Sequence, residues 1–410
     1  MSEEVVIIGG GIIGACSAYY LSEAGFKVTV VDKDSFGAGS SHANCGFLCP
    51  SHALPLCVPE ALLKPLKSMF KSYSPFYVNP LVGPSLWGWL WRFVMSCKPS
   101  QTLKSATARN ALLNSSMGLY KELIAKESID CEFQQKGLLF AHVEEKSLHH
   151  FSKTNDFLTK EFGLSATHYD SKGIVNLEPA LKDSVVGGWH YEGDAHLRSD
   201  KLMSELKRVL LSKGVTIVND CRVTEFIYEN KQISGIETTQ GPMSFDKLLL
   251  ATGAMAPKLA KKLGVKLHIQ PGKGYSLTTN RPKICPEIPM ILEDHSVAVT
   301  PFKNAFRLGS TMEFNGYDEQ INRRRLGLLE EGAKHYLRQV RGEQTEEEWF
   351  GWRPMTHNGI PIISQTRQKN TYIAAGHSML GLSMGSGTGK LVAEMMSGEE
   401  THIDSKNFLI

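Results

Sequence analysis

The sequence lacks long hydrophobic runs, paired cysteines and a strong excess of one charge. It contains no run of about 18 uncharged apolar residues, so we expect no membrane-spanning helix. A net charge of +3 over 410 residues argues against the basic surface of a nucleic-acid-binding protein. The eight cysteines form no Cys-x-x-Cys pair. This favours reduced thiols in a cytoplasmic protein, and we expect no metal site.

The beginning of the chain is apolar but lacks the basic flank of a secretory signal peptide. Glu3 and Glu4 precede the apolar stretch Val5–Ala18, so we expect this stretch to belong to the fold. The composition is otherwise that of an ordinary globular protein, with 42% hydrophobic and 21% charged residues. The length suggests two or three domains.

A buried strand followed at once by three glycines is the most informative stretch. Val5–Ile8 is apolar and β-branched, as in a parallel strand, and Gly9, Gly11 and Gly14 follow in the spacing G-x-G-x-x-G. The first glycine allows a tight turn, the second allows close approach of a pyrophosphate, and the third allows the helix Ile12–Ala24 to pack on the sheet. The start of that helix would face the phosphates with free N–H groups.

A second strand and an acidic residue complete this pattern. Lys27–Val31 reads as the next parallel strand, and Asp32 stands at its end, where it can accept hydrogen bonds from a ribose. The alternative is an ordinary βαβ unit of a hydrophobic core. Because strand, glycines, helix, strand and acid occur in register, we predict a dinucleotide-binding domain.

Three further segments are expected near the dinucleotide. Residues 33–50 form a loop of small, hydroxyl and amide side chains that can wrap a polar cofactor. Leu248–Ala254 is a buried strand with a small-residue turn, which predicts a return to the first sheet. Gly376–Gly387 reads as a glycine-rich turn, followed by a helix over Thr388–Ser397 whose dipole could face an anion.

Elsewhere the pattern indicates amphipathic helices and a mixed sheet. We expect a loop at Gly173–Pro179, a helix at Ser199–Lys213 with Ser199 as its cap, and a charged helix at Asp318–Gln339. Leu86–Met95 predicts an aromatic helix that is apolar on most sides and buried between domains. The alternative is a hydrophobic surface that contacts lipid or a membrane-bound electron acceptor.

Several motifs together resemble a known family. Ile7–Gly14, Ser41–Gly46, Gly272–Leu277, Gly351–Thr356 and Gly376-His377 occur in the order found in bacterial FAD-dependent D-amino-acid dehydrogenases. That family lies within the D-amino-acid oxidase and glycine oxidase superfamily, and the resemblance runs from residue 3 to about residue 400. It implies an α/β chain with a Rossmann-like FAD-binding domain at 1–55, 195–260 and 350–410. A mixed-sheet α+β substrate domain would comprise 56–194 and 261–349.

The resemblance also implies which residues bind FAD and substrate. The cofactor residues would be Gly9, Gly11, Ile12, Gly14, Asp32, Lys33, Ser40, Ser41, Asn44, Cys45, Gly46, Phe47, Val223, Ala251, Thr252, Gly253, Gly376, Gly381, Leu382, Ser383 and Met384. Arg353 matches the arginine that pairs with the substrate carboxylate, a role that suits a planar, permanently charged group; a structural ion pair is the alternative. Tyr275 is expected to act with Arg353 as a catalytic residue, although Tyr275, His52 and His377 could each line the pocket or be packed residues. Gly351 replaces the cysteine of relatives with covalent flavin, so noncovalent FAD is expected.

The implied reaction is oxidative deamination of a D-amino acid to a 2-oxo acid and ammonia, by hydride transfer from Cα to flavin N5. The electrons would pass to a quinone or another acceptor, which a cytoplasmic protein could reach at the inner face of the cell membrane. Alternatives are an enzyme of glycine, sarcosine or a cyclic imino acid such as D-proline or hydroxy-D-proline, an NAD-dependent dehydrogenase, and a non-catalytic flavin-binding subunit.

Overall fold

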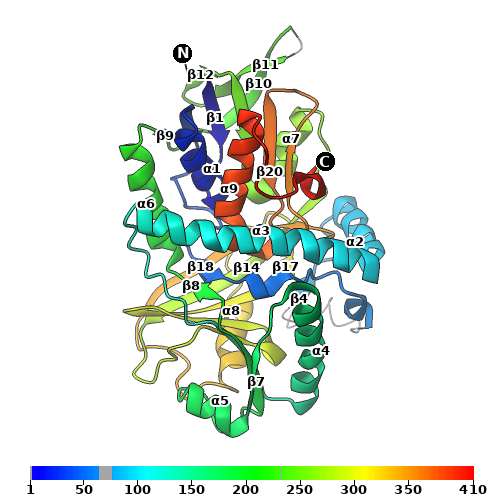
Figure 1. The fold of residues 1–410 in the computed structure, drawn as a ribbon, viewed down its shortest axis with the longest axis vertical. Coiled ribbons are helices and arrows are strands. Elements are labelled where there is room, and N and C mark those ends of the chain that lie inside the picture. The colour runs from blue at the N-terminus through cyan, green and yellow to red at the C-terminus, as the bar shows by residue number, and fades with distance from the viewer. Residues whose placement is uncertain (1, 64–75, 231) are drawn as a thin grey trace.

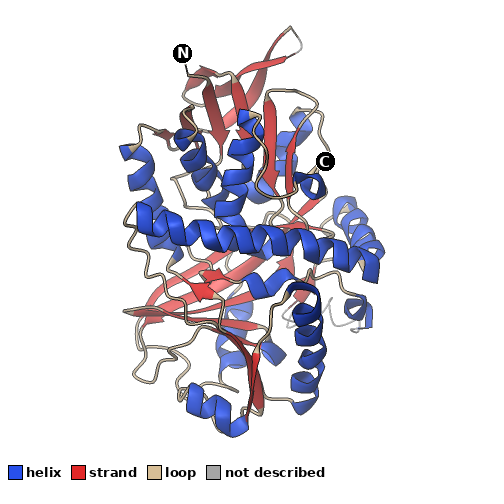
Figure 2. Cartoon of the chain, viewed as in Figure 1, coloured by secondary structure: helices blue, strands red, loops and turns tan. Residues whose placement is uncertain are grey.

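The computed structural model describes residues 2–63, 76–230 and 232–410. Two large sheets lie towards opposite ends of the long axis, and the helix α3 (Pro99–Lys126) crosses the molecule between them (Figure 1). Both halves combine helices with strands (Figure 2), as expected for the α/β class.

The first sheet contains the expected βαβ unit. Its strand order is β19-β20-β13-β1-β2-β9. The strands are β19 (Ile362–Gln365), β20 (Thr371–Ala375), β13 (Lys247–Leu250), β1 (Glu4–Ile8), β2 (Lys27–Val31) and β9 (Thr216–Val218). β1 pairs in parallel with both β2 and β13. The return of the segment after residue 247 to the first sheet is therefore confirmed.

Two helices that cover this sheet pack closely against each other, because glycines at their contact have no side chains. α1 (Ile12–Glu23) lies against α9 (Gly381–Ser397). A Cβ at Gly389 of α9 would stand 2.5 Å from the carbonyl carbon of Cys16 in α1. The prediction of a turn over Gly376–Gly387 is wrong beyond residue 380. The glycines from residue 381 onwards lie in the helix and serve close packing between helices.

The helix α3 packs on the first sheet's helices although its sequence falls in the predicted substrate domain. Tyr120 of α3 donates a hydrogen bond to the carbonyl oxygen of Leu382 in α9, with an O–O distance of 2.8 Å. The division into two domains remains a prediction, and α3 departs from it in its packing. Part of the predicted substrate domain, residues 64–75, lies outside the described residues.

The second sheet is mixed, as expected for a substrate domain. Its order is β18-β14-β17-β16-β15-β5-β7-β6, with β4 also paired to β17. The strands are β18 (Thr345–Thr356), β14 (Ile269–Asn280), β17 (Ala305–Phe314), β16 (Val297–Pro301), β15 (Met290–Leu292), β5 (Leu138–His142), β7 (Gly187–Tyr191), β6 (Thr167–Asp170) and β4 (Phe76–Val78). β14 pairs antiparallel with β17 on one side and β18 on the other.

Helices cover the second sheet and correct two predictions. α8 (Arg323–Ala333) packs on β14 and β17 and is shorter than the predicted Asp318–Gln339. Its N-cap is Asn322, whose side chain accepts a hydrogen bond from the Arg325 amide, so residues 318–321 precede the helix. α5 (Ser171–Leu177) occupies most of the predicted loop and is capped by Asp170. α4 (Glu145–Phe162) lies beside β5 and β7.

Smaller elements complete the fold. β10 (Val223–Glu229), β11 (Gln232–Thr238) and β12 (Gly241–Ser244) form a separate antiparallel sheet, and β3 (Phe47–Leu48) pairs with β8 (Ala195–His196). Two further α-helices are α6 (Ser199–Ser212) and α7 (Ala256–Lys262). Short 3-10 helices are η1 (Pro50–Ala53), η2 (Pro59–Leu63), η4 (Gly253–Met255), η5 (Glu293–His295), η6 (Ser378–Leu380) and η7 (Ser405–Phe408).

The aromatic helix α2 (Pro84–Ser96) is buried along one side only. Leu86 and Trp89 are 1% and 4% exposed and pack with residues of β17 and β18. Trp87 and Trp91 are 47% and 66% exposed. The prediction of a helix buried between domains is therefore wrong. None of the helices among the described residues is long and apolar enough to cross a membrane.

Candidate active site

The glycine turn after β1 is shaped by contacts that leave no room for side chains. Gly9 has a φ of +110°, and a Cβ there would lie 2.5 Å from the carbonyl oxygen of Ala251. A Cβ at Gly14 would overlap the carbonyl oxygen of Gly9. At Gly11 the nearest atom would be the Ser41 hydroxyl oxygen, 3.3 Å away. The turn therefore has the backbone form that a pyrophosphate needs.

Asp32 holds this turn together. Its carboxylate accepts hydrogen bonds from the amides of Gly10, at 2.6 Å, and Asp34, at 2.9 Å. Burial raises the pKa of Asp32 above its ordinary value. The amide of Ile12, at the start of α1, donates to the Ser41 hydroxyl at 2.9 Å. The ammonium group of Lys33 pairs with Asp34 at the surface.

A third segment meets the turn from β13. Ala251, Thr252 and Gly253 follow the end of that strand, and Gly253 adopts a φ of +52°. Among the described residues, the buried Thr252 hydroxyl has no hydrogen-bond partner. Val223 begins β10 close to Asp32, because the amide of Cys221 donates to the Asp32 carbonyl at 2.7 Å. An unpaired buried hydroxyl beside a glycine turn fits a polar phosphate group.

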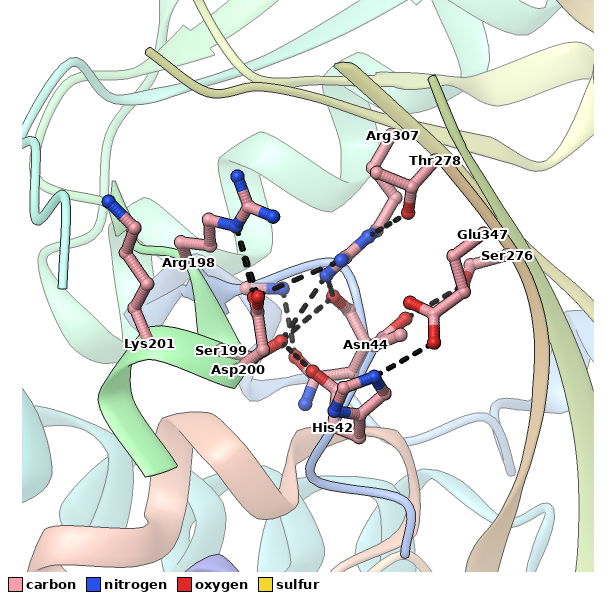
Figure 3. A network of polar contacts seen from close by, with 12 residues as sticks. His42, Asn44, Arg198, Ser199, Asp200, Lys201, Ser276, Thr278, Arg307 and Glu347 are labelled. Carbon is pink, nitrogen blue, oxygen red and sulfur yellow. Dashed lines mark hydrogen bonds and ion pairs between the residues drawn. The ribbon is translucent and has the colours of Figure 1, made fainter. Parts of the chain in front are cut away.

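The loop that follows β2 is fastened to the second sheet by side-chain hydrogen bonds, and two of the donors, Ser276 and Thr300, were not among the predicted site residues (Figure 3). The Ser276 hydroxyl donates to the Ala43 carbonyl at 2.8 Å, and the Thr300 hydroxyl donates to the Cys45 carbonyl at 2.7 Å. Ser40 reaches the same sheet by donating to the Trp352 carbonyl at 2.7 Å. Ser40–Phe47 is therefore held between both halves of the molecule.

Arg307 is the centre of this network. Its guanidinium is buried and donates to the Thr278 hydroxyl and to the Asn44 carbonyl, each at 2.8 Å (Figure 3). Asp200 stands 4.0 Å from it. A charged residue inside the apolar strand pattern of β17 was the signal that could have identified it. Ser199 donates to the His42 carbonyl at 2.7 Å, so its predicted role as a helix cap is wrong.

His42 joins the loop to β18 through an ion pair. Its Nε2 lies 2.8 Å from a carboxylate oxygen of Glu347 (Figure 3). The hydrogen bond with Glu347 raises the pKa of His42 and lowers the pKa of Glu347. Both side chains are partly exposed.

The start of α9 closes the other side of the loop. Gly376 has a φ of +82°, and Gly381, Leu382, Ser383 and Met384 form the first turn of the helix. The Ser383 hydroxyl donates to the Phe47 carbonyl at 2.7 Å. Gly46 packs against the Leu197 carbonyl with a φ of +72°. Because amides of a first helical turn lack intrahelical acceptors, this helix start can face an anionic group.

Arg353 is a partly buried cation without an acidic partner. One guanidinium nitrogen donates to the Thr311 carbonyl at 2.7 Å. Within the described ranges, no carboxylate oxygen lies within 4.0 Å of its guanidinium group. Burial lowers the pKa of Arg353. The alternative reading of Arg353 as half of a structural ion pair therefore has no support among the described side chains.

Two glycines make room around Arg353. Gly274 of β14 lies directly beneath the guanidinium group, which a Cβ at that position would overlap. Gly309 of β17 likewise accommodates the Cys45 sulfur. These glycines place Arg353 and the loop residue Cys45 on the same face of the second sheet.

Tyr275 lies on the opposite face, which corrects the prediction that it contacts substrate. It is 1% exposed and belongs to the core formed with α8. Its hydroxyl donates to a carboxylate oxygen of Glu313 at 2.8 Å, and Glu313 pairs with Arg325 at 2.9 Å. Neighbouring strand residues point to opposite sides of a sheet, so Gly274 and Tyr275 cannot both face Arg353.

Of the two candidate histidines, His377 is buried and His52 is partly buried, and both have a lowered pKa. His377 shares a hydrogen bond with Thr388 at 3.0 Å, and burial lowers its pKa to about 3. Burial, together with the charge of Arg109, lowers the pKa of His52 to about 4. Neither is placed as a base at this site. Among the described residues no group of three metal-ligating side chains is present.

The comparisons with known proteins agree with this geometry. Residues 4–395 match the family DAO, described as FAD dependent oxidoreductase. The chain is 31% identical to a D-amino acid dehydrogenase of Vibrio atlanticus, with 99% of both chains covered. It is 30% identical to a D-amino acid dehydrogenase of Granulibacter bethesdensis, with 99% of this chain and 98% of the relative covered.

Solved structures show the same fold at lower sequence identity. Glycine oxidase from Geobacillus kaustophilus superposes with a TM-score of 0.79 at 21% identity, covering 100% of this chain and 98% of that one. Glycine oxidase from Bacillus cereus superposes with a TM-score of 0.77 at 22% identity, covering 98% and 97%. The chain belongs to the DAO family of FAD-dependent oxidoreductases.

Proposed function

We propose that this protein oxidatively deaminates D-amino acids, with noncovalently bound FAD as its cofactor. The observation that carries the proposal is Arg353, whose guanidinium stands on the sheet face beside the cofactor loop with no acidic partner among the described residues. A planar guanidinium binds a carboxylate through two parallel hydrogen bonds. The two relatives with that activity in their names support the D-amino acid as substrate.

The cofactor residues form two groups in the proposal. Gly9, Gly11, Gly14, Asp32, Val223 and Ala251–Gly253 would hold the adenosine and pyrophosphate. Ser40–Phe47, Gly376 and the first turn of α9 would hold the flavin. The unpaired Thr252 hydroxyl and the helix starts of α1 and α9 support this assignment. Gly351 in place of a cysteine supports noncovalent binding.

The chain's own contribution to the reaction is orientation. Bound FAD supplies a hydride acceptor, so that the amine of the substrate becomes an imine. Arg353 would hold the α-carboxylate so that Cα–H points in one direction, since a charged two-point contact fixes a small molecule well. Water then converts the imine to a 2-oxo acid and ammonia. We assign no side chain as general base.

We propose a quinone or another membrane-associated molecule as the electron acceptor, reached by a cytoplasmic protein at the membrane surface. The support is the outer side of α2, where Trp87, Trp91, Val94 and Met95 are between 39% and 66% exposed. Exposed aromatic and apolar side chains on one helix face are typical of proteins that rest on a lipid interface.

Anaerobic titration of the purified holoenzyme tests the reaction. Bleaching of the flavin band by D-amino acids, but not by their L-enantiomers, is the expected result. Stronger bleaching by glycine, sarcosine or D-proline would instead assign the enzyme to one of those substrates. A bound flavin that no amine reduces would indicate a non-catalytic subunit, and release of NAD instead of FAD would exclude the proposal.

A further inference from the structure

The chain contains one long stretch without acidic residues. No aspartate or glutamate occurs between Glu60 and Glu122, although 42 of the 410 residues are acidic. The basic residues of this stretch are Lys64, Lys67, Lys71, Arg92, Lys98, Lys104, Arg109 and Lys121. It includes α2 and most of α3. A segment with charge of one sign is typical of a surface that faces a partner of the opposite charge.

The accessible cations of this stretch have no acidic partners. Arg92 on α2 is partly exposed, and Lys98 and Lys104, at the start of α3, are exposed. No carboxylate oxygen of the described residues lies within 4.0 Å of their charged nitrogens. At the other end of α3, by contrast, Lys126 pairs with Glu23. The positive charges next to α2 are therefore available to an external anion.

Two histidines beneath the last turn of α2 show that this region is electropositive. The Nδ1 atom of His357 lies 3.0 Å from the Ser96 hydroxyl, and its ring lies 6.5 Å from the ring of His268. Burial and the positive charges of Arg92 and Lys266 lower the pKa of His268. Burial, His268 and Arg92 lower the pKa of His357 to about 4. Each charged or titratable neighbour that shifts these two pKa values is basic.

Exposed apolar side chains lie beside these charges. The outer side of α2 carries Trp87 and Trp91, and Arg92 borders the same face because it directly follows Trp91 in the helix. Leu81, just before α2, and Leu103, near the start of α3, are also exposed. α2 stands at the periphery of the molecule, next to the beginning of α3 (Figure 1). One part of the surface thus combines indole rings, aliphatic side chains and unpaired cations.

We infer that this surface, formed by α2, the start of α3 and residues 266–268, binds a bilayer that contains anionic phospholipids. The indole rings lie at the boundary between hydrocarbon and headgroups. Arg92, Lys98 and Lys104 place their apolar stems along the lipid and their charges at the phosphate groups. A basic residue close to an anionic membrane strengthens binding about fivefold. The inference deepens the part of the proposed function that puts the electron acceptor at a membrane, and it rests on that part.

Vesicle sedimentation of the unmodified holoenzyme is the first test. We expect binding to vesicles of phosphatidylcholine and phosphatidylglycerol to be at least tenfold tighter than binding to phosphatidylcholine alone. Added salt should weaken it, because ions screen charges at a surface. Equal binding to both kinds of vesicle, or binding to neither, overturns the inference.

Removing three charges tests the assigned residues. We expect the variant Arg92→Gln, Lys98→Gln, Lys104→Gln to bind the anionic vesicles at least tenfold more weakly. Its FAD content and its reduction of a water-soluble dye should stay normal, since none of these side chains is assigned to cofactor or substrate. Unchanged vesicle binding by this variant overturns the inference.

The matched control removes the same number of charges elsewhere. The variant Lys172→Gln, Lys283→Gln, Lys334→Gln changes three exposed lysines outside this surface and should bind anionic vesicles like the unmodified protein. An equal loss in both variants would show that only the total charge matters and would overturn the inference.

Two further outcomes separate this surface from its rivals. If the unmodified protein is a dimer in solution and the Arg92, Lys98 and Lys104 variant is a monomer, the surface binds a second copy and the inference is overturned. Failure of every amino acid to reduce the flavin overturns the proposed deamination instead, because vesicle binding does not require turnover.

Discussion

The guanidinium group of Arg353 is positioned by its own sheet before any substrate arrives. The Thr311 carbonyl holds one edge of the group, and the bare backbone of Gly274 lies beneath it. A side chain held in this way loses little conformational freedom on binding, which is why positioned arginines orient small anions well.

Replacing Arg353 by lysine should impair substrate binding without loss of cofactor. Lysine is a point charge on a flexible stem and cannot form the planar pair, so we expect kcat/KM for a D-amino acid to fall by about 2–4 kcal/mol of transition-state free energy. Steady-state kinetics with each preparation normalised to bound flavin measures the effect. Full activity, or a loss that disappears on normalisation, would show that Arg353 is structural.

Gly274→Ala should displace the guanidinium group of Arg353 from its position on the sheet. The added methyl would overlap the guanidinium, so the side chain of Arg353 must move away from the sheet face. We expect kcat/KM to fall at least tenfold at normal FAD content. Gly118→Ala is the control, because a Cβ at this position of α3 meets nothing within 4 Å. Equal activities of the two variants would contradict the assigned position of Arg353.

The ion pair between His42 and Glu347 makes a stability contribution that depends on pH. Glu347 raises the pKa of His42, so the charged form is favoured in the folded protein. The contribution is fully present below the unfolded pKa of about 6.5 and is lost as pH rises through the raised value. We expect Glu347→Gln to lower the melting temperature at pH 6 and to have a smaller effect at pH 9. The ion pair would be excluded as the cause if Glu347→Gln lowered the melting temperature equally at both pH values. It would also be excluded if the exposed control Glu400→Gln showed the same dependence on pH.

At the scale of elements, the contact between α1 and α9 links the two cofactor regions. Each helix begins at one region, and Gly389 lets the helices approach closely. Gly389→Ala introduces overpacking, for which about 1–3 kcal/mol of destabilisation is typical. We expect a lower melting temperature and weaker FAD retention after gel filtration. Gly327→Ala, at a partly exposed position of α8 where a Cβ meets nothing within 4 Å, should show neither effect. Normal FAD retention in both variants would contradict the role of this contact.

Elements whose pattern is local were predictable from sequence, and those set by packing were not. Lys27–Val31 was expected with the bounds observed, because it is a short apolar run with clear ends. The glycines after residue 380 were read as a turn, because their benefit arises only when α1 lies against them. Tyr275 was assigned to the wrong face because β14 is buried on both sides, so no alternation of polar and apolar residues marks its faces.

In the candidate site, too, the residues of short motifs were predictable from sequence, and residues that act through contacts with distant segments were not. The glycine turn and Arg353 belong to compact motifs that a reader of the sequence can recognise. Arg307, Ser276 and Thr300 bind backbone atoms of a loop more than 200 residues away in the chain, as with Thr300 and Cys45, which are 255 residues apart. Every residue carries a backbone carbonyl that can accept a hydrogen bond, so the accepting residue can be of any type. The loop sequence therefore does not reveal that these side chains bind it.

At the scale of the whole molecule, the exposed side of α2 bears on how electrons leave the enzyme. Leu86 and Trp89 anchor the helix to the sheet that carries Arg353, and Trp87 and Trp91 project outwards. Indole rings favour the boundary between lipid and water, since they combine a large apolar surface with one N–H donor.

Replacing both exposed tryptophans should therefore separate membrane contact from catalysis. We expect the Trp87→Ser, Trp91→Ser variant to sediment with mixed neutral and anionic lipid vesicles several-fold less than the unmodified protein. Its reduction of a water-soluble dye should be maintained, because Leu86 and Trp89 still fix the helix. Leu211→Ser, at a leucine that is 53% exposed on α6, is the matched control and should sediment normally. If the unmodified protein does not bind vesicles, or the control loses binding equally, α2 is an ordinary surface helix and the acceptor reaches the flavin from solution.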